Sequence, residues 1–269
     1  LKLDLIKLCF EGPIEELTKT EIAQPAIMTS SITILKVLEK QGKNPDICAG
    51  HSLGEYSAYV AANWITFDDG LQAVRERGLA MAGADPDGRG TMAAIMGIDD
   101  NEIEKICKEA SSSGVVVPAN YNCPGQLVVS GDKDGVHRAM EIANEKGAKL
   151  VKELVVSGAF HSPLMEGAIG KFKDVVASLN ITKGKCPVIA NVNADVVNFE
   201  GIKESLIKQM TSSVRWTASV QKMMQMGADT FIEVGAGKIL QGLIKKVSKE
   251  IKSMCVADMK SYEDTISKI

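Results

Sequence analysis

The pentapeptide Gly50-His51-Ser52-Leu53-Gly54 places a serine between two glycines. Residues 46–49 before it predict the end of a buried strand, and residues 55–62 after it predict a helix. A serine at such a sharp turn presents its hydroxyl as a nucleophile, while the first free N–H groups of the helix, including that of Leu53, point at an oxygen that develops negative charge. Ser52 is therefore a candidate nucleophile, with a chance match of a short pattern as the alternative. We expect both glycines to be needed because the turn leaves little room for side chains.

A serine hydroxyl needs a base, and the chain has only three histidines. His161 lies where a predicted inserted domain ends and a helix begins, which suits a residue in a cleft. His51 is held in the turn and is expected to point elsewhere, and His137 falls within an amphipathic surface helix. His161 is the candidate base, and a purely structural histidine is the alternative.

A serine hydrolase of this type would also have an Asp or Glu between the serine and the histidine in chain order. The available aspartates are predicted to be turn or cap residues: Asp85, Asp87, Asp99 and Asp100. We therefore expect a backbone carbonyl or an amide side chain to orient His161. This expectation argues against an ordinary esterase.

The pattern along the chain predicts two interleaved domains. A helix is expected to begin with Pro25 in its first turn and to end at Gly42, and Thr66 is expected to cap a helix that carries Arg75 and Arg77. The Gly/Pro/Asp-rich stretch 84–90 is a predicted boundary.

Beyond that boundary the elements follow the order βαββαβ, which is typical of a ferredoxin-like arrangement. Asn120 and Asn122 are expected in a turn after its second strand, although they could instead present amides to a pocket. Alternating helices and strands then resume. We predict an α/β fold in which a large α/β-hydrolase-like parallel sheet domain (1–87 and 158–269) carries an inserted ferredoxin-like subdomain (88–157).

Composition excludes several classes of function. The chain has 269 residues, 45% of them hydrophobic and 24% charged, and a formal net charge of −3, so neither disorder nor nucleic-acid binding is expected. No apolar run approaches the roughly 18 residues of a membrane span, and the first residues lack signal-peptide features. The six cysteines are widely spaced, with no histidine at ligand spacing, so no metal site is predicted. A cytoplasmic protein is the expectation.

Several ordered motifs together resemble the malonyl-CoA:acyl carrier protein transacylases of fatty acid synthesis and the related acyltransferases of polyketide synthases. The resemblance covers nearly the whole chain. Three motifs carry most of the resemblance: residues 50–55, Arg75-Glu76-Arg77-Gly78 followed by Met81, and Gly158-Ala159-Phe160-His161. Further landmarks are 120–126, 214–216 and 233–238.

The resemblance implies a role for each site residue. Ser52 would be acylated, His161 would act as base and acid, and the backbone carbonyl of Gln209 would orient His161. Arg77 would hold the malonyl carboxylate, which suits a planar, permanently charged guanidinium. A surface charge on a helix is the alternative for that arginine. Substrate-binding roles would extend to Phe160, whose ring would leave little space for an α-methyl branch, and to Asn122 and Gln24.

By the same resemblance, the reaction would be ping-pong transfer of malonyl from malonyl-CoA to the phosphopantetheine thiol of acyl carrier protein, with no cofactor. Coenzyme A thioester and acyl carrier protein would be the partners. An acidic carrier would need a basic rim, for which the candidates are Lys238, Lys245 and Lys246, with a solvated helix face as the alternative.

The chain departs from the family at its start, where the opening strand and its Gly-Gln-Gly loop have no counterpart after Leu1. In the family that loop supplies the second oxyanion N–H, and the loss of one donor costs about 10²–10³ in rate. Two alternatives to the transferase stay open, the first on the serine turn alone and the second on the missing strand. One is a serine esterase or thioesterase of the α/β-hydrolase type, and the other is an inactive, N-terminally truncated fragment that only binds carrier protein.

Overall fold

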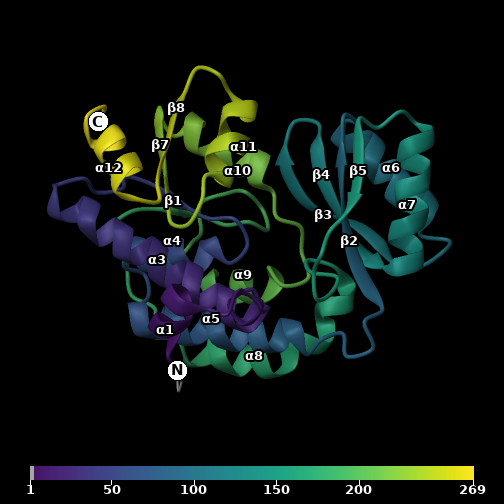
Figure 1. The fold of residues 1–269 in the computed structure, drawn as a ribbon, viewed down its shortest axis with the longest axis horizontal. Helices are drawn as coiled ribbons and strands as arrows, with labels where there is room; N and C mark the ends of the chain where they lie inside the picture. The colour runs from purple at the N-terminus through teal and green to yellow at the C-terminus, as the bar shows by residue number, and fades with distance from the viewer. Residues whose placement is uncertain (1–2) are drawn as a thin grey trace.

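A four-stranded antiparallel sheet forms one side of the molecule in the computed structural model, which describes residues 3–269 (Figure 1). Its elements are β2 (Gly90–Met96), α6 (Asp100–Ala110), β3 (Val116–Cys123), β4 (Gln126–Asp132), α7 (Lys133–Glu145) and β5 (Leu150–Glu153). The strand order β3-β4-β2-β5 and the two helices confirm the predicted βαββαβ arrangement. The boundaries of the two domains stay a prediction.

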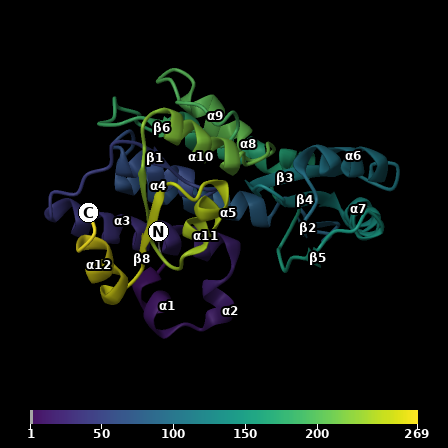
Figure 2. The same ribbon diagram turned by 90° about the horizontal axis from the view of Figure 1, so that it is seen from above.

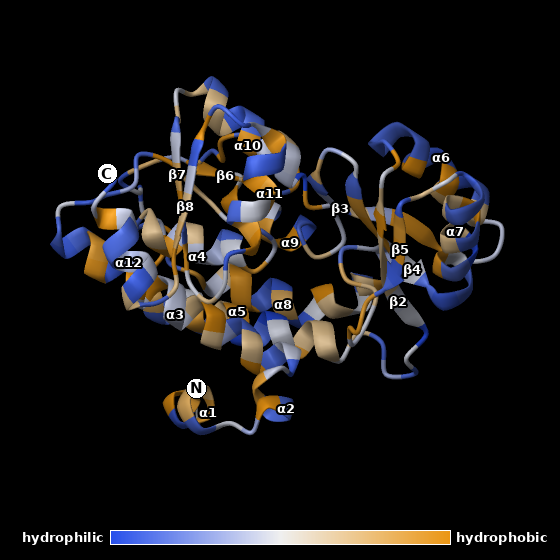
Figure 3. Ribbon diagram, turned by 45° about the horizontal axis from the view of Figure 1, so that its top comes forward, coloured by the Kyte–Doolittle hydropathy of each residue, from blue (hydrophilic) through white to orange (hydrophobic). Residues whose placement is uncertain are grey.

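The two faces of this sheet have different neighbours. Helices α6 and α7 cover the outer face, over a core that includes Ile95, Ile106 and Leu127 (Figure 2). The strands are mostly hydrophobic and the exposed sides of the helices mostly hydrophilic, as Figure 3 shows. On the other face, Met92 and Val128 form a small cluster against Phe160. The sheet therefore packs against the segment that carries His161.

The rest of the chain is built around two parallel strand pairs, β1 (Cys48–Ala49) with β6 (Val188–Ile189), and β7 (Thr230–Val234) with β8 (Lys252–Val256). Parallel pairing is what the alternating pattern predicts. A groove of about 1420 Å³ is lined by β1, β7 and one face of α3 (Thr20–Lys40). The nucleophile turn, including His51 and Leu53, lies along the same groove.

Helices surround these pairs. They are α1 (Leu5–Glu11), α2 (Ile14–Leu17), α4 (Gly54–Ala61), α5 (Phe67–Ala82), the 3₁₀ turn η1 (Pro163–Met165), α8 (Glu166–Ser178), α9 (Ile202–Lys208), α10 (Trp216–Gln225), α11 (Ile239–Val247) and α12 (Met259–Ile266). Thr66 caps α5 as predicted, because its hydroxyl accepts from the Asp69 N–H at 3.1 Å. None of the helices within residues 3–269 has both the length and the apolar composition that a membrane span requires.

The prediction that Pro25 lies in the first turn of its helix is wrong. Helix α3 begins at Thr20, so Pro25 lies inside it. Proline has no N–H, and the carbonyl it would have bonded, that of Glu21, instead accepts the Arg75 guanidinium at 2.6 Å. A tertiary contact therefore replaces the missing helix bond.

The prediction of a turn at Asn120 and Asn122 is also wrong. Strand β3 continues to Cys123 because it gains a second partner: the Tyr121 N–H donates to the Val214 carbonyl at 2.9 Å, and the Val214 N–H donates to the Ala119 carbonyl at 2.8 Å. This contact joins the small sheet to the large part of the molecule and carries Asn122 to the nucleophile turn.

Candidate active site

Ser52 occupies a strained turn between β1 and α4. Its φ of +53° lies in the left-handed region, which a residue with a side chain rarely adopts. Gly50 makes the turn possible, since a Cβ there would lie 1.9 Å from the backbone of Gly54. The expectation for Gly54 itself is wrong, because a Cβ there would meet no described atom within 4 Å. Close approach of strand to helix therefore requires only the first glycine.

Asn191 holds this turn from the segment after β6. Its Oδ1 accepts the Ser52 N–H at 2.7 Å, and its Nδ2 donates to the Gly50 carbonyl at 2.7 Å. Because β6 pairs in register with β1, Ala49 opposite Ile189, the asparagine arrives beside the turn. Its side chain is fully buried. Sequence reasoning missed Asn191, for which a polar residue two positions after a buried strand was the available signal.

His161 lies against the serine. Its Nε2 is 2.7 Å from Ser52 Oγ, and its Nδ1 faces two carbonyl oxygens, those of Gln209 at 2.9 Å and Ser212 at 3.2 Å. Carbonyl oxygens only accept, so Nδ1 carries the proton and Nε2 is free to accept the serine hydroxyl. Burial, together with the charge of Arg77, lowers the pKa of His161 to about 3. The imidazole is therefore neutral at ordinary pH, and its Nε2 can accept a proton.

Arg77 is a buried cation beside the nucleophile. The residue is 1% exposed, and its guanidinium donates to Gln24 Oε1 at 2.9 Å, Gln209 Oε1 at 2.9 Å and Ser52 Oγ at 3.0 Å. The Nε atom of Arg77 has no hydrogen-bond partner among the described residues. The guanidinium as a whole forms no ion pair with any carboxylate of residues 3–269. Burial lowers its pKa, yet arginine stays charged in proteins. This corner of the site is suited to an anion.

Close packing of α5 on α3 brings Gln24 to Arg77. A Cβ at Gly78 would lie 2.6 Å from the Cα of Glu21, so only glycine allows this approach. Arg75, on the same helix, fastens the contact through its bond to the Glu21 carbonyl. The pattern Arg-x-Arg-Gly therefore combines one residue that joins the helices, one that enters the site, and a glycine that gives them room.

The side chain of Gln209 connects the site to a buried carboxylate. Its Nε2 donates to Glu55 Oε2 at 2.7 Å and to the Ser52 carbonyl at 2.9 Å. Glu55 is fully buried on α4, and burial raises its pKa to about 7 although neighbouring donors and the charge of Arg77 oppose the rise. The sequence prediction for Gln209 concerned only its backbone carbonyl, and it did not include Glu55.

The remaining predicted residues lie around this centre. The Leu53 N–H, at the start of α4, donates no hydrogen bond to any described residue and so can serve an oxyanion. Phe160 packs between the main core and the small-sheet cluster, next to His161 in the chain. Asn122 bonds to His51 at 2.9 Å, so its amide positions the turn instead of facing open space.

The other histidines are placed differently from His161. The His51 ring points away from the serine, bonded to Asn122 and 5.9 Å from the Trp216 ring. His137 is half exposed on α7, 3.3 Å from Glu153. Neither ring contacts Ser52, so His161 is the histidine that the fold brings to the nucleophile.

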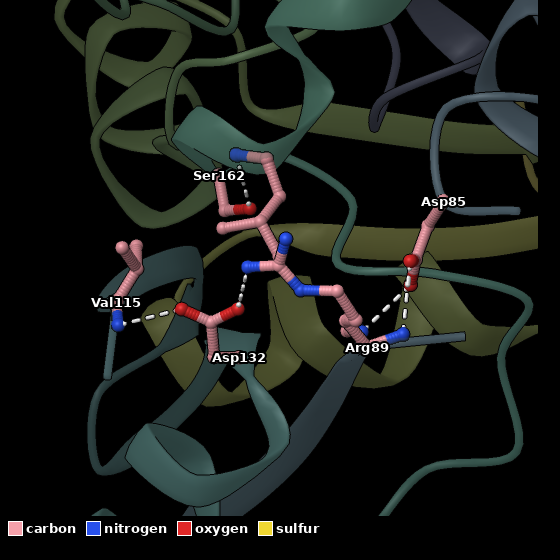
Figure 4. A network of polar contacts seen from close by, with 7 residues as sticks. Asp85, Arg89, Val115, Asp132 and Ser162 are labelled. Carbon is pink, nitrogen blue, oxygen red and sulfur yellow. Dashed lines mark hydrogen bonds and ion pairs between the residues drawn. The ribbon is translucent and has the colours of Figure 1, made fainter. Parts of the chain in front are cut away.

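Two of the four aspartates considered between the serine and the histidine, Asp85 and Asp99, have structural partners. Asp85 accepts the N–H groups of Arg89 and Gly90, and the Arg89 guanidinium reaches Asp132 at 3.1 Å (Figure 4). Asp99 caps α6 by accepting the Glu102 N–H. Two carbonyls thus orient His161 where a hydrolase would use a carboxylate, and no three His, Cys, Asp or Glu side chains of the described part of the chain gather as metal ligands.

Comparison with known proteins agrees with this geometry. The acyl transferase domain family matches residues 2–264. The malonyl CoA-acyl carrier protein transacylase of Bacillus subtilis is 47% identical over 265 residues, which are 98% of this chain and 84% of that protein. The crystal structure of a malonyl-CoA:acyl carrier protein transacylase from Xanthomonas oryzae superimposes with a TM-score of 0.96 at 38% identity, covering 99% of this chain and 85% of that one. A malonyl-transacylase in complex with a type II polyketide acyl carrier protein has a TM-score of 0.96 at 36% identity, covering 100% and 87%.

Proposed function

The chain belongs to the acyl transferase domain family, and from that membership we propose how its residues transfer malonyl from coenzyme A to acyl carrier protein. Its function is that of a malonyl-CoA:acyl carrier protein transacylase, with a coenzyme A thioester and acyl carrier protein as partners. The proposal assigns Ser52 as nucleophile, His161 as base and acid, and Arg77 as the malonyl clamp. The cytoplasmic location stays a prediction.

The observation that carries the proposal is the buried Arg77, 1% exposed, without a carboxylate partner and 3.0 Å from Ser52 Oγ. An uncompensated buried cation is costly to a fold. A malonyl group ends in a carboxylate two bonds beyond the thioester carbonyl, so one acyl group reaches the serine and the guanidinium together. A neutral ester carries no negative charge that could pair with the guanidinium. The esterase alternative is therefore not favoured.

In the first half-reaction, Ser52 Oγ attacks the thioester carbonyl while His161 Nε2 takes the hydroxyl proton. The carbonyl oxygen becomes an oxyanion that the Leu53 N–H stabilises. The carbonyl re-forms as the C–S bond breaks, and His161 returns its proton to the departing coenzyme A thiolate. The products are a malonyl-Ser52 ester and free thiol.

In the second half-reaction, the phosphopantetheine thiol of the carrier gives its proton to His161 and attacks the ester. The C–O bond breaks, and Ser52 regains the proton. The low pKa of His161 favours the acid steps, because an imidazolium of low pKa releases its proton readily to a leaving group, and it makes the imidazole a weaker base in the steps that remove a proton. The Gln209 and Ser212 carbonyls support the transient charge. We propose no resident cofactor in this scheme.

The pocket side chains around these three refine the choice of acyl group and carrier. Gln24 holds one arm of Arg77, and Asn122 holds His51 beneath the turn. We assign the restriction on α-branched acyl groups to the Phe160 ring. Lys238, Lys245 and Lys246 are exposed at and along α11 and are the proposed docking rim for an acidic carrier.

The test is acylation by radiolabelled malonyl-CoA. The protein is expected to take one label, the Ser52→Ala variant none, and the Ser57→Ala variant as much as the parent, since Ser57 lies on α4 away from these bonds. Absence of label on the parent protein would refute the proposal. Rapid hydrolysis of neutral esters that is unchanged by Arg77→Ala would instead favour the esterase.

A further inference from the structure

Glu55 is a buried carboxylate that the proposed chemistry does not use. It lies in the first turn of α4, three residues after the nucleophile, and is 0% exposed. Its Oε2 accepts two hydrogen bonds, from Gln209 Nε2 at 2.7 Å and from the Asn191 N–H at 3.0 Å. Its Oε1 has a longer contact, 3.4 Å, with the Tyr59 hydroxyl. One carboxylate oxygen thus binds two segments, the one that follows β6 and the one that follows α9.

The chemistry of its neighbours fixes which way the Gln209 amide faces. A carboxylate only accepts hydrogen bonds and a guanidinium only donates them. Gln209 lies between the two, so its NH₂ must face Glu55 and its Oε1 must face Arg77, which donates to it at 2.9 Å. Without Glu55, the Gln209 NH₂ loses its shortest acceptor and keeps the Ser52 carbonyl at 2.9 Å, so the amide is held less firmly in the orientation that faces its oxygen to Arg77.

We propose that Glu55 is a positioning residue for Arg77, which it aims at the acyl carboxylate through the side-chain amide of Gln209. Glu55 thereby sets the preference of the site for acyl groups that end in a carboxylate. The inference rests on the proposed role of Arg77 as the malonyl clamp.

An acceptor oxygen, more than a negative charge, is what this role requires. Both hydrogen bonds end on Oε2, so a proton on Oε1 leaves them in place. A glutamine at position 55 can place its carbonyl oxygen at the same point and its NH₂ toward the Tyr59 hydroxyl, which can accept. Glu55→Gln therefore keeps the relay, by which we mean the hydrogen bonds that join Glu55 to the Gln209 amide and that amide to Arg77, and Glu55→Ala removes it.

The experiment measures the ratio of kcat/KM for acylation of Ser52 by malonyl-CoA over acetyl-CoA. Glu55→Ala is expected to lower this ratio about tenfold or more, the usual effect of losing a hydrogen bond to a charged group. Glu55→Gln is expected to stay within about threefold of the parent. Tyr59→Phe, which removes only the long contact to Oε1, is the matched control and is expected to leave the ratio unchanged.

A double-mutant cycle separates this role from general support of the fold. In an Arg77→Ala background the ratio is already low, and adding Glu55→Ala is expected to change it by less than about twofold. An equal loss in both backgrounds, or a Glu55→Ala protein with the parent ratio, would overturn the inference. A tenfold loss in Glu55→Gln would overturn it too.

Gln209→Met provides a second route should Glu55→Ala not fold. It keeps the backbone carbonyl that faces His161 and removes the side-chain link between Glu55 and Arg77, together with the bond to the Ser52 carbonyl. It is expected to lower the ratio as Glu55→Ala does, and an unchanged ratio would contradict the inference. Failure of the parent protein to acylate at all would refute the proposed function, which is a different outcome from an acylated protein whose selectivity ignores Glu55.

Discussion

Replacement of Glu55 by glutamine should stabilise the protein at alkaline pH and have much less effect at acidic pH. In the folded protein, burial raises the pKa of this carboxyl from 4.5 to about 7, and unfolding returns it to its ordinary value. Between these two values the folded state binds more protons than the unfolded state, so the free energy of unfolding falls as pH rises. A glutamine has no proton to lose and avoids this fall.

The size of the effect follows from the two pKa values. A difference of about 2.5 between 4.5 and 7 corresponds to about 3.4 kcal/mol at 1.36 kcal/mol per pH unit. Of this, about 2.5 kcal/mol accrues between pH 5 and pH 8.5, because ionisation of the unfolded state is already under way at pH 5. The stability of Glu55→Gln relative to the parent should rise by that amount over the interval.

The assay is urea unfolding of both proteins at half-unit steps from pH 5 to pH 8.5. Subtracting parent from variant cancels the other titrating groups, and any packing penalty of the glutamine is independent of pH. Glu204→Gln is a control at an exposed carboxylate on α9, and no comparable alkaline gain is expected there. A difference that stays flat with pH, or declines as pH rises, would refute the reasoning. A decline would mean that Arg77 stabilises the ionised form by more than burial costs it.

Three further predictions concern the elements that hold the nucleophile. Because the pKa of His161 is lowered to about 3, its imidazole stays neutral in mild acid. Acylation rates measured by rapid quench from pH 8 to pH 5 should therefore show no break near pH 6.5. A break there would show a histidine that titrates as it does in water and would contradict the lowered pKa. Asn191→Ala leaves two backbone groups without partners, the part-buried Ser52 N–H and the buried Gly50 carbonyl, and should lower the free energy of unfolding by about 2–4 kcal/mol in urea. A loss below about 1 kcal/mol would contradict the role of Asn191 in holding the turn. Gly50→Ala should prevent the native turn, because the added Cβ would lie 1.9 Å from the backbone of Gly54. Gly54→Ala should keep the melting temperature of the parent protein, because its Cβ would meet no described atom within 4 Å. Equal tolerance of both substitutions would contradict the close approach of strand to helix at Gly50.

Local signals in the sequence were enough to predict much of the fold. The cap at Thr66, the glycine after α3 and the alternation of the small sheet act over a few residues, so their pattern is visible in the chain. The predictions failed where a distant segment decides the structure. Pro25 lies inside a helix because Arg75 satisfies the carbonyl it frees, and Asn122 extends a strand because Val214 pairs with that strand.

The candidate site divides in the same way. The sequence motifs were enough to predict the central residues of the candidate site, because Ser52, Arg77 and His161 each lie in a distinctive local pattern. The local pattern does not show how other residues hold them, even for Glu55, which ends the 50–55 motif. The roles of Asn191 and Glu55 are recognised only when the turn and the segment after β6 are seen together, since the two residues contact each other across 136 positions of the chain and Asn191 contacts Ser52 across 139.

The placement of Arg77 explains why the site needs so many amides. A carboxylate in direct contact would neutralise the guanidinium, but it would also occupy the position that we propose for the acyl carboxylate. Amide oxygens from Gln24 and Gln209 solvate the cation and leave its charge uncompensated. Glu55 stands one amide further away, close enough to orient Gln209 yet without an ion pair to the arginine. Burial lowers the pKa of His161 most, and the charge of Arg77 lowers it further, so the arginine that we propose selects the acyl carboxylate also helps to keep the proposed base neutral.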